Sequence, residues 1–230
     1  MTPYYDWRQS HLLHHESSGN HSKPEILFNS TIVNTVKEYN AFPQWKRRVY
    51  RILRDPLFFF TIAPSLLFFI YYRFVRGSMI ANIGITVMYI MLYYFGSWNL
   101  VSLHAISMMF ASSTGFFLFH TQHSYNPSYV TPLSGKYDRF DASIIGSSLL
   151  PIPAPLNWFT YGIEYHHIHH LTTAIPGYNL QKAHYAAPPN MWKHVYVFDS
   201  FAKIWDSLKL VLWDDNSHRF VSFGDLKQCQ

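Results

Sequence analysis

The 230-residue chain is poor in charge, since 13% of its residues are charged and 19% are aromatic, and its net charge is +5. Soluble domains average about 25% charged residues, so this composition argues against an ordinary soluble domain. In a membrane protein a positive excess is typical of the cytoplasmic face, so it gives no indication of nucleic-acid binding.

The first part of the chain, to about Asn40, is polar and starts without the apolar run of a signal peptide. A single cysteine, Cys229, excludes an intrachain disulfide and favours a reducing compartment. The next stretch, Ala41–Asp55, is basic and amphipathic. We expect it to be a solvated face beside a membrane, a docking patch for an acidic electron carrier, or both. Its cations are Lys46, Arg47, Arg48, Arg51 and Arg54.

An apolar block at residues 56–119 predicts an integral membrane segment. A spanning helix needs about 20 apolar residues. Pro56–Tyr72 is one candidate, and Gly77–Phe119 is long enough for two more, joined by a turn at Gly96, Ser97 and Asn99. His104 lies inside the last candidate, where we expect it to form a hydrogen bond between helices.

The rest of the chain is aromatic and rich in proline and histidine as far as about Pro189. Its apolar stretch Ile144–Leu156 is short and broken by prolines, so we expect no membrane crossing there. The last part contains an amphipathic pattern that predicts a helix from about Phe198 to Trp213. Together these features predict an all-α integral membrane fold, with a membrane block at 56–119 and a cytoplasmic helical cap formed by residues 1–55 and 120–230.

Histidine spacing is the strongest chemical signal in the sequence. His11, His14 and His15 form an HxxHH pattern, and His166, His169 and His170 form another. On a helix, positions i, i+3 and i+4 share one face, so each pattern directs three imidazoles to one point. A further histidine, His123, follows the membrane block directly. Neutral imidazole is a good ligand for iron, copper, nickel and zinc, so the pattern predicts a metal site.

The number of candidate ligands favours two metal ions over one. Seven imidazoles exceed the four ligands of a structural zinc site. A dinuclear zinc hydrolase normally has bridging carboxylates, and acidic residues are scarce here, which makes hydrolysis the weaker alternative. The remaining polar neighbours, which we expect to support the ligands through hydrogen bonds, are Glu16, Glu164, His167 and His184. We expect His120 to point away from the metal, and His21, His194 and His218 to lie at the surface.

A shared site constrains the membrane topology. If His15 and His123 bind one metal centre, both lie on the same side of the bilayer, and the chain between them crosses an even number of times. The three candidate spans give an odd number, so we expect one of them not to cross. The first candidate could be the one that does not cross, because it contains Pro64. The third could be the one instead, because it contains several polar residues, and the sequence does not decide between them.

These segments resemble the membrane fatty acid desaturases, in particular the acyl-lipid type. Pro3–His15 looks like the second histidine box of that family, and Tyr165–Leu171 looks like the third. The similarity covers nearly the whole chain and continues through Ser18–Asn20, Phe119–His123, Asn157–Phe159, Ile175–Leu180 and Leu212–Phe223.

The resemblance implies a single desaturase domain over residues 1–230, in which two non-haem irons and O2 introduce a cis double bond into the acyl chain of a lipid. It implies that His11, His14, His15, His123, His166, His169 and His170 are the iron ligands. Electrons would come from a ferredoxin or a small haem protein. The membrane would be the bacterial inner membrane, the endoplasmic reticulum or the plastid, with the boxes on the cytoplasmic side.

One departure from the family pattern bears on activity. The family has a first histidine box upstream of the second, and these 230 residues do not contain it. We therefore expect an N-terminally truncated domain whose two missing ligands come from a separate chain or a longer gene. The alternatives are a non-catalytic remnant, half of a split enzyme, or a membrane di-iron hydroxylase, because hydroxylases share the boxes.

Overall fold

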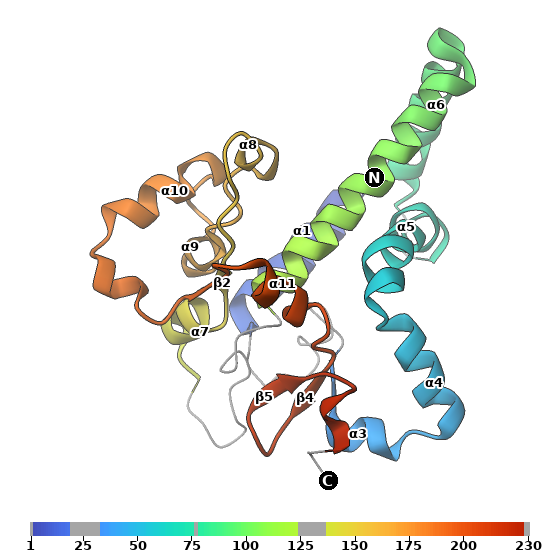
Figure 1. The fold of residues 1–230 in the computed structure, drawn as a ribbon. Coiled ribbons are helices and arrows are strands. Elements are labelled where there is room, and N and C mark those ends of the chain that lie inside the picture. Colours follow the sequence, from blue (N-terminus) through green and yellow to red (C-terminus); the bar gives the residue numbers. More distant parts are fainter. Residues whose placement is uncertain (1, 19–32, 76–77, 124–136, 228–230) are drawn as a thin grey trace. The chain divides into compact units, whose positions relative to one another are not determined.

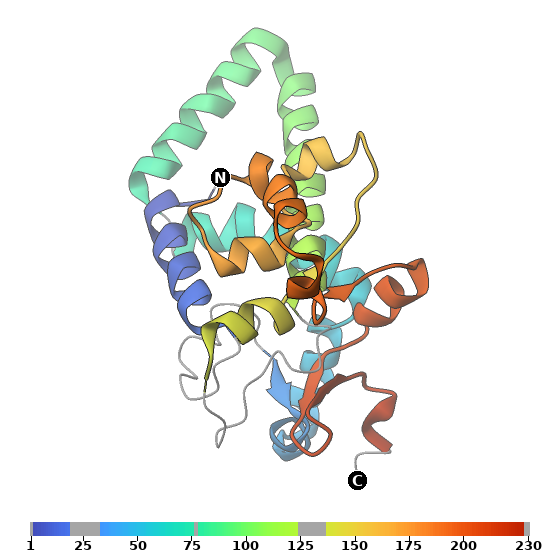
Figure 2. The same ribbon diagram turned by 90° about the vertical axis from the view of Figure 1, so that its left-hand side faces the viewer.

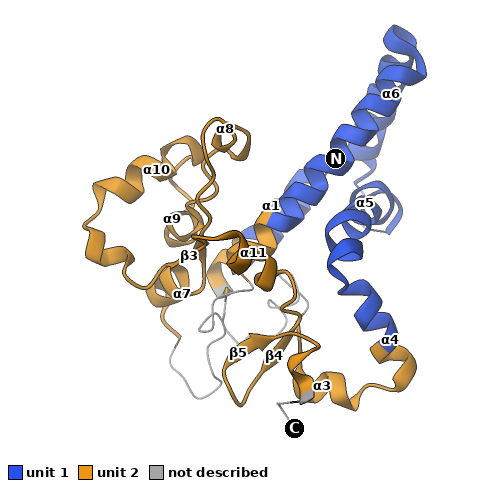
Figure 3. Cartoon of the chain, in the orientation of Figure 1, with its two compact units in different colours: residues 1–11, 48–117 blue, residues 12–47, 118–230 orange. Residues whose placement is uncertain are grey.

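The computed structural model describes residues 2–18, 33–75, 78–123 and 137–227, so the expectations for His21 and Cys229 lie outside the described residues. Most of the described chain is helical, with two small sheets, so the expectation of an all-α fold holds only in part (Figure 1). The chain divides into two compact units (Figure 3). One contains residues 1–11 and 48–117, and the other contains residues 12–47 and 118–230.

The first unit contains a continuous helical segment, made of η1 (Phe58–Ile62), α5 (Ala63–Leu66) and η2 (Leu67–Val75). Asp55 begins it, because its carboxylate accepts hydrogen bonds from the backbone N–H groups of Leu57 and Phe58, at 3.0 and 3.2 Å. The η1 and η2 parts are π-helical. Pro64 at the start of α5 has no N–H to donate, which removes one regular α-helical hydrogen bond at this point.

The long helix α6 (Met79–His123) is a hairpin of two helical limbs. Gly96 and Ser97 leave the helical conformation, with φ values of −146° and +58°, so the predicted turn is confirmed. Across it, the Tyr93 and Trp98 rings lie 5.2 Å apart. The hydroxyl of Tyr89 lies 3.3 Å from His104 Nδ1, which confirms the hydrogen bond expected of His104.

Two helices of the described chain are long and apolar enough to cross a membrane: the Phe58–Val75 segment and α6. Because α6 is a hairpin, it supplies two of the three predicted candidates. Their composition and length indicate a membrane protein.

The second unit consists of short helices and two small sheets. Its core contains Tyr165, Ile168 and Leu180, and Ile175 and Trp192 pack against them. Its helices are α3 (Val36–Ala41), α7 (Arg139–Ile145), α8 (Asn157–Thr160), α9 (His166–Leu171), α10 (Gly177–Ala186), η3 (Pro189–Trp192), α11 (Phe201–Ser207) and η4 (Asp225–Lys227). Two further helices, α1 (Tyr4–Ser17) and α4 (Gln44–Leu53), have residues in both units.

The strands are short and the sequence analysis did not predict them. β4 (Leu212–Asp214) pairs in parallel with β1 (Asn34–Thr35) and antiparallel with β5 (Arg219–Val221). In the second sheet, β2 (Ser148–Leu149) and β3 (Tyr196–Val197) pair in parallel. No membrane crossing occurs within Ile144–Leu156, as expected, since α7 ends at Ile145 and β2 follows.

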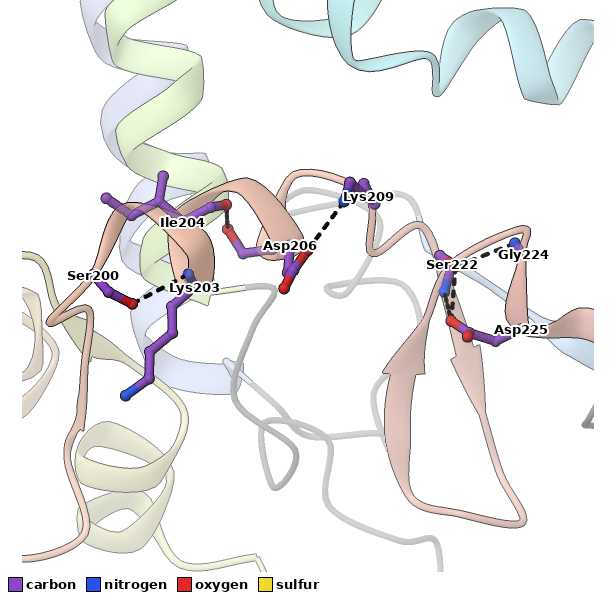
Figure 4. A network of polar contacts seen from close by, with 9 residues as sticks. Ser200, Lys203, Ile204, Asp206, Lys209, Ser222, Gly224 and Asp225 are labelled. Atoms are coloured by element: carbon purple, nitrogen blue, oxygen red, sulfur yellow. Dashed lines mark hydrogen bonds and ion pairs between the residues drawn. The ribbon is translucent and has the colours of Figure 1, made fainter.

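The predicted helix from Phe198 to Trp213 is wrong in extent. Ser200 caps α11 by accepting a hydrogen bond from the Lys203 N–H, and the helix ends at Ser207 (Figure 4). Beyond it, Trp213 is buried in β4, where its ring lies 5.1 Å from that of Phe220 on β5. The apolar pattern that suggested one helix therefore combines a helix face with a buried strand.

Replacing Tyr89 by Phe removes the hydroxyl that joins the two limbs of α6. Hydrogen bonds between membrane helices contribute about 0.6–2 kcal/mol, so we expect a loss of stability of this size. Thermal unfolding in detergent measures it, with Tyr94→Phe as the control because the Tyr94 ring is exposed. Equal stability of the two variants would show that the Tyr89–His104 contact does not hold the hairpin.

Candidate metal centre

Helix α1 presents its histidines on one face, as the HxxHH spacing predicts. His14 and His15 are buried, with 2% and 3% of their surface exposed. His11 lies one turn before His15 on the same helix, and their potential ligand nitrogens are within 4.8 Å of each other. The ring of Trp7 stacks on His11 at 4.8 Å, which supports this first histidine from the helix itself.

Helix α9 carries the second HxxHH pattern and is fixed in place by backbone contacts. Gly162 precedes it with a φ of +81°, a conformation that favours glycine, and a Cβ there would lie 2.4 Å from the Gly177 carbonyl oxygen. Gln122 donates to the Ile163 carbonyl at 2.8 Å, and Ser143 donates to the His170 carbonyl at 3.2 Å. These contacts hold the backbone on both sides of the box.

The imidazoles of three separate segments converge through their Nε2 atoms. His123, at the end of α6, has its Nε2 3.2 Å from that of His14 and 2.7 Å from that of His166. His166 in turn lies 3.1 Å from His170, Nε2 to Nε2. The Nε2 atoms of His15 and His169 are 3.0 Å apart. The two boxes and His123 thus share one location.

Hydrogen bonding alone accounts poorly for this geometry. An imidazole nitrogen carries either a proton or a lone pair, never both. In the series His14–His123–His166–His170 every contact uses Nε2, so at most two of the three contacts are linear N–H···N bonds. Two ligand nitrogens at right angles around a metal about 2.1 Å away would be about 3.0 Å apart. The observed spacings of 2.7–3.2 Å fit nitrogens directed at common metal ions.

The donor set also fits a metal. In the described ranges, the two groups of potential ligands consist of histidine alone: His14, His123 and His170 form one, and His15 and His169, with His11 on the same helix as His15, belong to the other. Burial, followed by the charge of neighbouring imidazoles, lowers the pKa of His166 and His170 well below the ordinary value. Both rings are therefore neutral at pH 7, which is the form that binds metal.

His167, His184 and Glu164, which were expected to support the ligands, direct their side-chain hydrogen bonds to residues other than the seven candidate ligands. His167 points away from the ligand cluster, as its box position predicts, and its Nε2 lies 2.9 Å from His184 Nδ1. His184 stacks on Trp192, whose indole N–H donates to the His184 carbonyl at 2.9 Å. His120 likewise points away and contacts the Ser207 carbonyl at 2.9 Å.

The two acidic neighbours of the boxes differ. Glu164 is buried and accepts a hydrogen bond from the Thr160 hydroxyl at 2.8 Å. Glu16 is exposed, and its backbone carbonyl accepts a hydrogen bond from Tyr137 at 3.4 Å. Glu164 is therefore the better placed of the two to support the box.

The model of the fatty acid desaturase family matches residues 1–202. The chain belongs to the fatty acid desaturase family. The match includes both HxxHH boxes and His123, so the converging imidazoles lie inside the family domain.

Two curated relatives agree with this assignment. The chain is 29% identical over 237 residues to a fatty acid desaturase of Bacillus subtilis (strain 168), an alignment that covers 99% of this chain. It is 26% identical over 240 residues to an sn-1 oleoyl-lipid 12-desaturase of Picosynechococcus sp., covering 96% of this chain. The chain spans 66% of the length of each relative.

Sequence reasoning missed the residues that position the third box. Gln122 and Ser143 are polar, buried and distant in sequence from the backbone groups they contact. Ser148 does the same for the end of α6, since its hydroxyl donates to the Thr121 carbonyl at 2.7 Å. Of these, Gln122 carried a usable signal, because it is a polar residue directly beside His123 at the end of an apolar run.

Acid should weaken the fold through the His167–His184 pair. Burial, followed by the charge of His184, lowers the pKa of His167 to about 3 from an ordinary 6.5. Since the folded pKa is depressed, the unfolded chain takes up the proton first. The stability is therefore complete above about pH 6.5 and falls as the pH drops toward 3.

The double variant His167→Leu/His184→Leu should show a shallower loss of stability with acid, by up to about 1.4 kcal/mol per pH unit for each of the two histidines removed. Unfolding midpoints in detergent between pH 4 and 7.5 measure this slope. His218→Leu, at an exposed position, is the control. A slope in the double variant equal to that of the unchanged chain would contradict the assignment.

Proposed function

We propose that this chain provides the di-iron site of an O2-dependent enzyme that introduces a cis double bond into the acyl chain of a membrane lipid. The observation that carries the proposal is the convergence of the Nε2 atoms of two histidine boxes and His123, within a chain of the fatty acid desaturase family. Seven imidazoles without carboxylate ligands suit two irons.

In this proposal His14, His123, His166 and His170 hold one iron, and His11, His15 and His169 hold the other. Bound iron at this position supplies the activation of O2 and the oxidising power to remove hydrogen from adjacent methylenes. The two irons would be the cofactor, which the imidazole donors fit, and O2 would be the co-substrate.

The protein's own residues perform three tasks at the site. Burial of His14, His166 and His170 keeps bulk water from the ligand nitrogens, and it keeps the His166 and His170 rings unprotonated. The contacts from Gln122 and Ser143 to the backbone fix the direction of the third box. Rigid placement of this kind matters because a ligand displaced by about 1 Å loses much of its effect.

The proposed substrate is an acyl chain that is already part of a lipid. One relative is named for a lipid-linked oleoyl chain and for position 12. We take from it the substrate class only, since the chain itself offers no measure of the double-bond position. The apolar helices would keep the enzyme in the same phase as such a substrate.

The proposed partners follow the family resemblance. Electrons would come from a ferredoxin or a small haem protein on the cytoplasmic side, where the histidine boxes would lie. A segment or chain carrying a first histidine box would supply two further imidazoles. The host membrane would be the bacterial inner membrane, the endoplasmic reticulum or the plastid.

Expression in a desaturase-deficient host, with and without a first-box segment from a relative, tests the activity. We expect a new cis double bond in the membrane lipids, detected by gas chromatography and mass spectrometry. His14→Ala and His166→Ala should reduce the product below detection, because each removes a proposed ligand. His218→Ala, on the β4–β5 turn, should retain it.

Two other outcomes of this experiment would identify the alternative functions. An alcohol in place of the double bond would identify a hydroxylase. No product under either condition, with the protein present in the membrane, would identify a non-catalytic remnant.

A further inference from the structure

Residues 151–161, just before the third box, form a loop whose large side chains are apolar and exposed. Between Asp141 and Glu164 the chain contains no Asp, Glu, Lys, Arg or His. Large side chains of the loop are 55–76% exposed, namely those of Leu156, Trp158, Phe159 and Tyr161. A contiguous exposed surface of this kind marks an interaction site.

The loop is bonded at both ends to the last turn of α6. Ser148, before the loop, donates from its hydroxyl to the Thr121 carbonyl at 2.7 Å. Gln122 donates from its amide to the carbonyl of Ile163, after the loop, at 2.8 Å. The long apolar run of α6 has just ended at this point. The loop is therefore held where that helix passes from apolar to polar sequence.

A closed neck separates the loop from the rest of the second unit. The Leu150 N–H donates to the Glu164 carbonyl at 3.4 Å, and Leu149 and Tyr165 form an antiparallel bridge. Within the second unit, α8 lies at the end opposite the β4–β5 pair in both ribbon views (Figures 1 and 2). The loop is thus an excursion that begins and ends on buried backbone.

The backbone of the loop is suited to an environment without water. Its three prolines have no N–H group that needs a partner. The N–H groups of Leu156, Trp158 and Phe159 donate to carbonyls inside the loop, at 2.9, 3.1 and 3.0 Å. Such internal bonding is what lipid demands, because an unbonded N–H in hydrocarbon has no water to replace its partner.

Exposed aromatic residues elsewhere in this unit have a different setting. On α11 the exposed rings of Phe201 and Trp205 stack at 6.5 Å. The Lys209 ammonium lies 5.5 Å from the centre of the Trp205 ring and forms an ion pair with Asp206 at 3.0 Å. A surface that mixes rings with ion pairs is suited to water. The loop has no such ions, so water is a less favourable neighbour for it.

Lipid suits the loop better than a second protein does. Trp and Tyr are enriched where membrane proteins contact the headgroup region. A stable protein interface uses roughly 20–30 residues a side, far more than this loop presents. Lipid is also the adjacent phase, because α6 is long and apolar enough to span a bilayer and its last turn is bonded to the loop.

We propose that residues 151–161, together with Tyr178, form an anchor that enters the boundary between lipid headgroups and acyl chains. Tyr178 on α10 belongs to it because its ring is 62% exposed and lies 5.8 Å from that of Tyr161. Since the loop carries no charge, it enters zwitterionic lipid and needs no anionic headgroup. The anchor holds the start of the third box, at His166, near the bilayer surface.

The depth of single spin labels tests the anchor. Cysteines are introduced in a Cys229→Ser background, in phosphatidylcholine nanodiscs that contain one chain each. A label at Phe159→Cys should be relaxed more by oxygen than by a water-soluble nickel complex. A label at Asn216→Cys, on the β4–β5 turn, should show the reverse. Stronger relaxation of the Phe159 label by nickel would overturn the proposal.

Lipid charge and a second copy are tested with the same label. Addition of phosphatidylglycerol should leave the ratio of oxygen to nickel relaxation at Phe159 unchanged. Protection of this label from nickel that appears only in discs with two chains would identify a contact between copies. That outcome would also overturn the proposal.

Paired substitutions separate insertion from folding. With the label at Tyr178→Cys, the pair Trp158→Lys/Phe159→Lys should lose the protection from nickel. The pair Trp158→Leu/Phe159→Leu should retain it, because both side chains stay apolar.

The α11 pair Phe201→Lys/Trp205→Lys is the matched control and should retain the protection as well. Equal protection in the lysine and leucine pairs of the loop, or an equal loss in the α11 pair, would contradict the anchor. None of these readouts needs iron or turnover, so they stand apart from the proposed desaturation.

Discussion

Buried imidazole nitrogens that face one another must share protons or share a metal ion, and the histidine cluster depends on this constraint. Its Nε2 atoms are 2.7–3.2 Å apart in a series that hydrogen bonds cannot fully satisfy. Protonation would place like charges in contact inside a region of low polarity, at a high free-energy cost. Burial lowers the pKa of His166 and His170 and so favours the neutral, metal-binding form. The same burial that disfavours protonated imidazoles therefore favours the binding of a metal ion.

The supporting structure of the second unit serves mainly to orient these rings. Outward-facing histidines next to the candidate ligands hold the elements together: His167 in the third box contacts His184 on α10, and His120 on α6 contacts the Ser207 carbonyl at the end of α11. A box on one helix thus has two roles, with its inward positions directed at the site and its outward positions bonded to neighbours. The second limb of α6 is continuous from the apolar region to His123, so one helix joins the membrane part to the site.

Local patterns in the sequence predicted the features that depend on residues close together along the chain. The HxxHH spacing predicted both helical faces, and Gly96 with Ser97 predicted the α6 turn. The His104 contact followed from a polar residue in an apolar run. Features that depend on distant pairing were not predictable in the same way. Leu212 and Trp213 are apolar residues at a spacing that a helix also allows, and only their pairing with β1 and β5 makes them a strand. The Arg73–Asn82 contact between the Phe58–Val75 segment and α6 is another such feature, because no periodicity in the sequence shows it.

The central claim is that the converging imidazoles bind two irons, and the iron content of the detergent-purified chain tests it most directly. Iron is measured by plasma emission spectrometry and protein concentration by amino-acid analysis. We expect two irons per chain. We expect the His14→Ala and His166→Ala variants to lose this iron and the His218→Ala variant to retain it. Iron at background level in the unchanged chain, or full iron in the two ligand variants, would contradict it.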